Sequence, residues 1–106
     1  MPYVIAYSPE AVEHLMALSK SQQVLVLDQV DEQLTDQATL PTRRRKFLRP
    51  NAIPPWELRL GNIRVFYDVE EAVATPSESR PATVVVKAVG IKEHNKLRIG
   101  GVEIQL

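Results

Sequence analysis

Residues 56–69, WELRLGNIRVFYDV, carry the strongest structural signal in the chain. Apolar side chains occupy every second position on both sides of Gly61-Asn62, a dipeptide typical of two-residue hairpin turns. Such a turn pairs Arg59 directly with Arg64. The alternation then places one set of side chains on a face that must be buried: Trp56, Leu58, Leu60, Ile63, Val65 and Tyr67.

The opposite face of this predicted hairpin carries Glu57, Arg59, Arg64 and Phe66. Two arginines directly opposite each other destabilise a sheet unless a negative charge lies nearby. Glu57 supplies one such charge diagonally. A bound anion is a second source, because a pair of guanidinium groups matches the geometry of phosphate. The alternative is that both arginines are solvated, or paired with Glu57 and Glu93.

The N-terminal third predicts a strand followed by two helices. Residues 3–7 are rich in strand formers, and Ser8-Pro9-Glu10 is a typical helix start. This helix is expected to end near Ser19-Lys20, and Ser21 is expected to cap the next one. In the second helix the sequence predicts an apolar stripe at three- and four-residue steps, ending before Pro41: Val24, Leu27, Val30 and Leu34.

The rest of the chain alternates loops and strands. Residues 41–55 contain four prolines, so we expect a long loop, and residues 72–81 read as a second one. Residues 82–90 contain a β-branched run typical of a central strand. Residues 97–99 and 102–104 flank two glycines and predict a terminal hairpin. The order predicts one α+β domain over residues 1–106, with two helices on one face of a mainly antiparallel sheet.

Composition limits the function classes. The chain has 106 residues and no cysteine, which excludes disulfides and thiolate chemistry. We expect a cytoplasmic protein without a membrane partner, since there is no signal-peptide pattern and no long apolar run. Net charge is zero, but residues 1–42 hold one base and six acids, whereas residues 43–106 hold 12 bases and seven acids. A local basic surface is therefore possible despite the neutral total.

A run of basic residues leads into the hairpin: Arg43, Arg44, Arg45, Lys46 and Arg49. Together with the hairpin arginines it forms a candidate surface for an RNA backbone. Phe47 and Phe66 would then supply stacking surfaces for bases. A solvated loop and a docking site for an acidic protein remain alternatives.

His94 is a candidate general acid or base, because it follows the strand end at Gly90 and histidine is the side chain most often used for proton transfer. An inert histidine on an exposed turn is the alternative. No spacing of histidines and carboxylates predicts a metal site, and no glycine-rich phosphate loop is present, so we expect no metal and no other cofactor.

The stretch 56–69 resembles the RelE/ParE superfamily of toxins from bacterial type II toxin–antitoxin systems. The resemblance includes the Val89-Gly90 strand end with the charged residues that follow it, and the order of elements over residues 3–94. The chain is similar in particular to a branch that ends in a Gly-Gly hairpin, here at Gly100-Gly101.

The resemblance implies a toxin neutralised by a cognate antitoxin protein. RelE-like members cut mRNA at the ribosome without a metal, by attack of a 2′-hydroxyl on the adjacent phosphate. The resemblance then implies that Arg59, Arg64 and Lys92 hold the phosphate, and that Glu57 or His94 moves the proton.

The second reading is a non-catalytic binding protein. ParE-like members inhibit DNA gyrase, and a degenerate homologue would act mainly through its antitoxin. Two observations favour this reading: no tyrosine follows Tyr67, whereas ribonuclease members usually carry one near the C-terminus, and the neutral net charge contrasts with the basic character of strongly active members.

Overall fold

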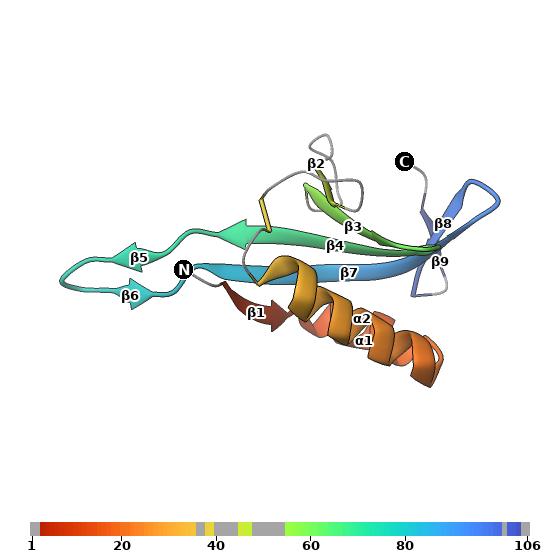
Figure 1. The fold of residues 1–106 in the computed structure, drawn as a ribbon, viewed down its shortest axis with the longest axis horizontal. Helices are drawn as coiled ribbons and strands as arrows, with labels where there is room; N and C mark the ends of the chain where they lie inside the picture. Colours follow the sequence, from red (N-terminus) through yellow and green to blue (C-terminus); the bar gives the residue numbers. More distant parts are fainter. Residues whose placement is uncertain (1–2, 36–37, 40–44, 48–54, 101, 105–106) are drawn as a thin grey trace.

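Two helices and a long twisted sheet form the described part of the chain (Figure 1). The structure is a computed structural model that describes residues 3–35, 38–39, 45–47, 55–100 and 102–104, with the backbone alone at 46, 47 and 104. The helices are α1 (Pro9–Met16) and α2 (Lys20–Leu34). The strands are β1 (Val4–Tyr7), β2 (Arg45–Phe47), β3 (Trp56–Leu60), β4 (Ile63–Glu70), β5 (Val73–Ala74), β6 (Ser79–Arg80), β7 (Thr83–Glu93), β8 (Lys96–Ile99) and β9 (Val102–Ile104).

The main sheet has the order β2-β3-β4-β7-β8-β9, and β1 also pairs with β7. All its pairs are antiparallel except β1 with β7. The central strand β7 therefore pairs with β4 along one edge. Along its other edge it pairs first with β1 and then with β8. This arrangement confirms the predicted α+β class with a mainly antiparallel sheet, as well as the terminal hairpin β8–β9.

The predicted hairpin turn at Gly61-Asn62 is also confirmed. Leu60 pairs with Ile63 and Arg59 with Arg64, so β3 and β4 are joined by two residues. Gly61 has a φ of +64°, a left-handed conformation that glycine adopts without steric cost. All six side chains predicted for the inner face are buried: Trp56, Leu58, Leu60, Ile63, Val65 and Tyr67.

Helix boundaries differ from the prediction at one junction. The first helix does start after Ser8, whose hydroxyl accepts from the Ala11 N–H, but it ends at Met16. Ser19, not Ser21, caps α2, because its side chain and that of Gln22 satisfy each other's backbone N–H groups in a capping box. The two helices are thus joined by residues 17–19, a longer connection than expected.

The apolar stripe predicted for α2 is wrong in two of its four positions. Val30 and Leu34 are buried as expected, but Val26 completes the stripe, while Val24 and Leu27 are about half exposed. The reason is that residues 24–27 are all apolar, so two stripes are compatible with the sequence. Packing against the sheet selects the one at steps of four residues, which joins Ala11 and Leu15 of α1 in the core.

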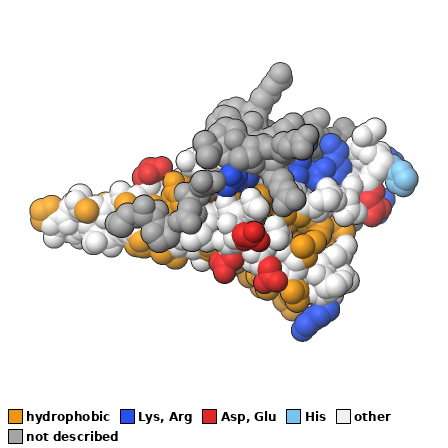
Figure 2. Space-filling model, viewed as in Figure 1, with side chains coloured by type: hydrophobic (Ala, Val, Ile, Leu, Met, Phe, Trp, Pro, Cys, Tyr) orange, Lys and Arg blue, Asp and Glu red, His pale blue; other side chains and the backbone are white. Residues whose placement is uncertain are grey.

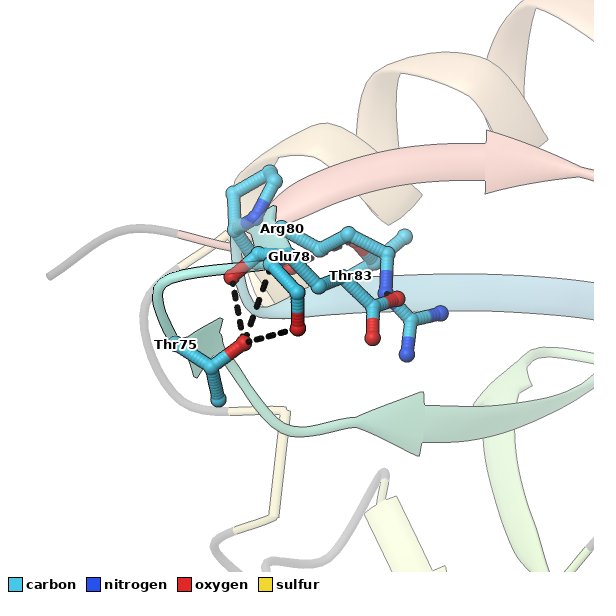
Figure 3. A network of polar contacts seen from close by, with 6 residues as sticks. Thr75, Glu78, Arg80 and Thr83 are labelled. Atoms are coloured by element: carbon cyan, nitrogen blue, oxygen red, sulfur yellow. Dashed lines mark hydrogen bonds and ion pairs between the residues drawn. The ribbon is translucent and has the colours of Figure 1, made fainter.

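Two of the expected loops contain short strands. Residues 45–47 form β2 at the edge of the sheet, and residues 73–80 form the hairpin β5–β6, an arm that extends the molecule beyond β4 and β7 (Figure 1). Thr75 closes the arm's turn, because its hydroxyl donates to the Glu78 carbonyl and accepts from the Glu78 N–H (Figure 3). Strands of two or three residues show no periodicity that sequence reasoning can detect.

Neither described helix is both long and apolar enough to cross a membrane.

Candidate functional site

The face of the sheet that the helices leave free carries the charged residues of the β3–β4 hairpin. Strand alternation puts Glu57, Arg59, Arg64 and Phe66 on this face, as the sequence predicts. We call Glu57, Arg59 and Arg64 the arginine-pair site. In the view of Figure 2, basic side chains gather near the place where β3, β4 and β8 come together, and acidic side chains lie over α2, on the upper left edge and at the right-hand tip.

Arg59 and Arg64 are direct cross-strand partners. Since a two-residue turn makes Leu60 and Ile63 the hydrogen-bonded pair, the arginines form the next, non-hydrogen-bonded pair, with Cα atoms about 4.5 Å apart. The register of the two strands keeps the side chains close together, although their like charges repel each other. The site therefore concentrates two positive charges at one place on the sheet.

Glu57 offsets part of this charge. Its side chain is 6% exposed, and its Oε1 accepts from Arg59 Nε at 2.6 Å, whereas the Arg59 side chain is 35% exposed. The ion pair therefore has a buried acid and an accessible base. Sequence alternation predicts the pairing of Glu57 with Arg59, but not the burial of the carboxylate.

The Arg64 guanidinium folds back over the hairpin turn. Its Nη1 donates to the carbonyls of Gly61 and Ile63, at 2.5 and 3.1 Å. Its Nε is buried and makes no hydrogen bond within the described part of the chain. Burial lowers the pKa of the Arg64 guanidinium below its usual range; nearby Glu57 opposes this effect and Arg59 adds to it. Arg64 is thus a half-buried cation whose charge is only partly compensated.

Lys92 lies beside the arginine pair on the same face. Gly90 pairs with Arg64, and Lys92 is two residues further along β7, so strand alternation places both on this face. The Lys92 N–H donates to the Asn62 carbonyl at 2.7 Å, which ties β7 to the turn between the two arginines. The predicted grouping of Lys92 with Arg59 and Arg64 is thus found at the level of strand register.

His94 lies at the exposed tip of the β7–β8 hairpin, with a φ of +51°. Its Cα is four residues beyond Gly90, which corresponds to about 13 Å along a strand. His94 therefore lies away from Arg59 and Arg64, whereas Glu57 belongs to the arginine-pair site.

The predicted basic run is only partly within the described residues. Arg43, Arg44 and Arg49 lie outside them, and Lys46 is described by its backbone alone, at the register position opposite Glu57. Arg45, which the sequence predicts as part of a surface for an RNA backbone, is buried instead. It is 4% exposed, and its Nη1 donates to the Gln33 carbonyl of α2 at 2.5 Å. Arg45 pairs with Leu58, whose side chain faces the core, so it ties β2 to the helices.

Phe66 is also placed differently from the expectation of a stacking surface. Its side chain is 0% exposed and lies outside the helix-side core, as does buried Leu97 of β8. These two side chains show that the helix-free face has buried apolar residues of its own. The Phe47 side chain lies outside the described residues.

Sequence reasoning missed the structural importance of Gly90. A Cβ at this position would lie 2.5 Å from the Arg98 carbonyl oxygen and 2.7 Å from a side-chain carbon of Ile99. Any other residue would therefore push β8 away from the strand that pairs with Arg64. The glycine within a β-branched run was the available signal, since glycine inside a strand often marks a close backbone approach.

Within the described residues, no group of three or more histidines and carboxylates is arranged to hold a metal ion. No protein-family model matches the chain, and no curated protein is significantly similar to it in sequence.

Proposed function

We propose that this protein is a RelE/ParE-type toxin that cleaves mRNA at the ribosome without a metal and is neutralised by a cognate antitoxin protein. The observation that carries the proposal is the cross-strand pair Arg59–Arg64 beside a buried Glu57, on the face free of helices. The order of strands and helices over residues 3–94 supports it, because two helices precede a hairpin and a long central strand.

The arginine pair is suited to a phosphodiester. Two guanidinium groups with one carboxylate leave a net positive charge, and Arg64 has donor capacity that the described residues do not use. A phosphate acquires additional negative charge as the 2′-oxygen attacks it, so arginines placed there stabilise the transition state more than the ground state. Lys92, on the same face, adds a third cation next to the turn.

The reaction also needs a proton acceptor and a proton donor. The attacking 2′-hydroxyl gives up its proton to the acceptor as its oxygen bonds to phosphorus; the bond from phosphorus to the 5′-oxygen then breaks, and that oxygen takes up a proton from water. Glu57 is favoured as the acceptor, because it is in contact with Arg59, whereas His94 lies beyond the end of β7, in the turn to β8. A cyclic 2′,3′-phosphate and a free 5′-hydroxyl are the expected products.

The test is to induce the protein in a bacterial host and to map mRNA 5′ ends. The wild type is compared with Arg64→Ala and with Arg80→Ala, a matched control at an exposed arginine of the β5–β6 arm. We expect new cuts in translated regions, reduced about 100- to 1000-fold in Arg64→Ala by analogy with the loss of one donor from an oxyanion hole. Arg80→Ala should cut normally.

Other outcomes separate the second reading from the first. Growth arrest without new mRNA ends, accompanied by DNA damage signalling, would support the ParE-like inhibition of DNA gyrase. Neither arrest nor cuts would indicate a binding protein that acts through its antitoxin. Undiminished cutting by a folded Arg64→Ala protein would overturn the proposed phosphate site, even if the protein is a ribonuclease.

A further inference from the structure

A separate pocket lies on the helix-covered face, where the edge of β7 changes partners. Pairing with β1 ends at Val86, and pairing with β8 starts at Gly90. Helix α1 crosses this interruption, with the Val89 N–H donating to His14 Nδ1 at 3.2 Å. Beyond the end of α1 the space stays open and forms a pocket of about 230 Å³.

One wall of this pocket is apolar, and the other carries groups of opposite charge. Leu18 and Ile91 line the apolar part, while Glu93 and Arg98 line the polar part. Arg98 pairs with Ile91, and Glu93 is two residues from Ile91, so both share the face turned toward α1. None of the ion pairs formed among the described residues involves Glu93 or Arg98.

His14 adds a directed hydrogen-bond donor. Because its Nδ1 accepts the Val89 N–H, the neutral ring carries its proton on Nε2. That atom faces the β8–β9 turn, since a Cβ on Gly100 would lie 3.5 Å from it. No hydrogen bond within the described residues uses Nε2, and both His14 and Gly100 line the pocket. The pocket thus offers an imidazole N–H and a guanidinium as donors, and one carboxylate as acceptor.

We propose that this pocket binds a small zwitterion with a short apolar body, of the class of free α-amino acids. Arg98 and the His14 Nε2–H would bind the carboxylate, and Glu93 the ammonium group. The apolar body would lie against Leu18 and Ile91.

The size of the pocket supports a ligand of this class. At about 230 Å³ it is smaller than the pockets of roughly 300–1,000 Å³ that take drug-sized ligands. The proposal is independent of RNA cleavage, because the pocket and the arginine-pair site lie on opposite faces of the sheet. Gly90 contributes to both, since it lines the pocket and pairs with Arg64.

The test uses calorimetry on the full chain with L-alanine, L-valine and L-leucine as probes. Two truncated probes match leucine: 4-methylpentanoate lacks the ammonium group, and 3-methylbutylamine lacks the carboxylate. We expect saturable binding of at least one amino acid. Each truncated probe should bind about tenfold more weakly than leucine, which is the effect of one lost charge-assisted hydrogen bond. The proposal is overturned if none of the three amino acids binds, or if either truncated probe binds as tightly as leucine.

Three variants locate the binding. Arg98→Gln and Glu93→Gln alter exposed side chains and should leave thermal unfolding unchanged while weakening amino-acid binding about tenfold. Ala17→Leu fills the pocket and should abolish binding. Arg80→Gln, at an exposed arginine of the β5–β6 arm, is the matched control and should bind like the wild type. Wild-type affinity in folded Arg98→Gln or Ala17→Leu would contradict the assignment of the pocket.

Discussion

The two faces of the sheet use the same strands but bury different chemistry. On the helix-covered face, β3 and β4 contribute only apolar and aromatic side chains to the core, among them Leu58, Val65 and Tyr67. On the helix-free face, the positions between them hold Glu57, Arg59 and Arg64, next to a fully buried Phe66. The first face stabilises the fold, whereas the second places charges at positions that stability alone would not select.

This difference indicates where function and stability can be separated. Opposed arginines cost stability, and under the proposed function a phosphate that binds both of them offsets this cost.

The largest effect is expected on the helix-covered face. Leu58 is 0% exposed, so Leu58→Ala should lower the free energy of unfolding by about 2–5 kcal/mol through lost burial and the cavity left behind. Urea denaturation followed by circular dichroism measures this. Leu27→Ala is the matched control at a half-exposed leucine of α2 and should change stability by less than about 0.5 kcal/mol. Equal losses of unfolding free energy at both positions would mean that Leu27 packs in the core, as the apolar stripe predicted for α2 requires.

An intermediate effect is expected in the arginine-pair site. Glu57→Gln removes the buried charge that compensates Arg59 and should cost about 1.5–3 kcal/mol of unfolding free energy. Phosphate should then raise the melting temperature more than it does for the wild type, because an anion replaces the missing charge. Glu78→Gln, at an exposed ion pair of the arm, is the control and should change stability by about 0–1 kcal/mol. A phosphate response that is the same in all three proteins would argue against an anion site here.

A smaller effect is expected for Tyr67→Phe, which removes the hydrogen bond from the Tyr67 hydroxyl to the Ala38 carbonyl at 2.6 Å. The expected loss is about 1 kcal/mol. Burial raises the pKa of Tyr67, with Arg45 opposing the rise, and it raises the pKa of Tyr7 to about 12. Because folding favours the protonated phenols, their contribution to stability is complete below pH 10.0, the ordinary phenol value, and declines as pH rises toward 12.

The alkaline decline provides the check on Tyr67. Unfolding free energies measured at several values between pH 9 and pH 11.5 should fall less steeply for Tyr67→Phe than for the wild type. An identical slope for the two proteins would mean that Tyr67 is as accessible to ionisation in the folded chain as in the unfolded one.

How far the sequence predicts this molecule depends on the length of each pattern. The hairpin of residues 56–69 was predictable down to its register, since period-two alternation continues on both sides of a two-residue turn. The stripe of α2 was not, because four consecutive apolar residues fit two orientations and only the sheet distinguishes them. The short strand β2 and the arm β5–β6 are too brief to show any period.

The residues that form the candidate site were predictable from the sequence, but their burial and their contacts were not. Strand alternation alone groups Glu57, Arg59 and Arg64 on one face. The burial of Glu57 and Arg45 depends on contacts with distant parts of the chain, such as the Gln33 carbonyl that accepts from Arg45. Such partners lie close together only after the helices have packed, so no local pattern shows them.

The proposed function requires that the helix-free face binds the phosphodiester of RNA. The direct test is an NMR titration of the arginine Nε–H signals with a short RNA whose 2′-hydroxyls are methylated and which therefore cannot be cleaved. We predict that the signals of Arg59 and Arg64 shift, with an affinity that falls as salt increases, while the signal of Arg98 on the opposite face stays in place. Shifts at Arg98 or in the helices, with Arg59 and Arg64 unchanged, would show that RNA binds elsewhere and would overturn the proposed phosphate site.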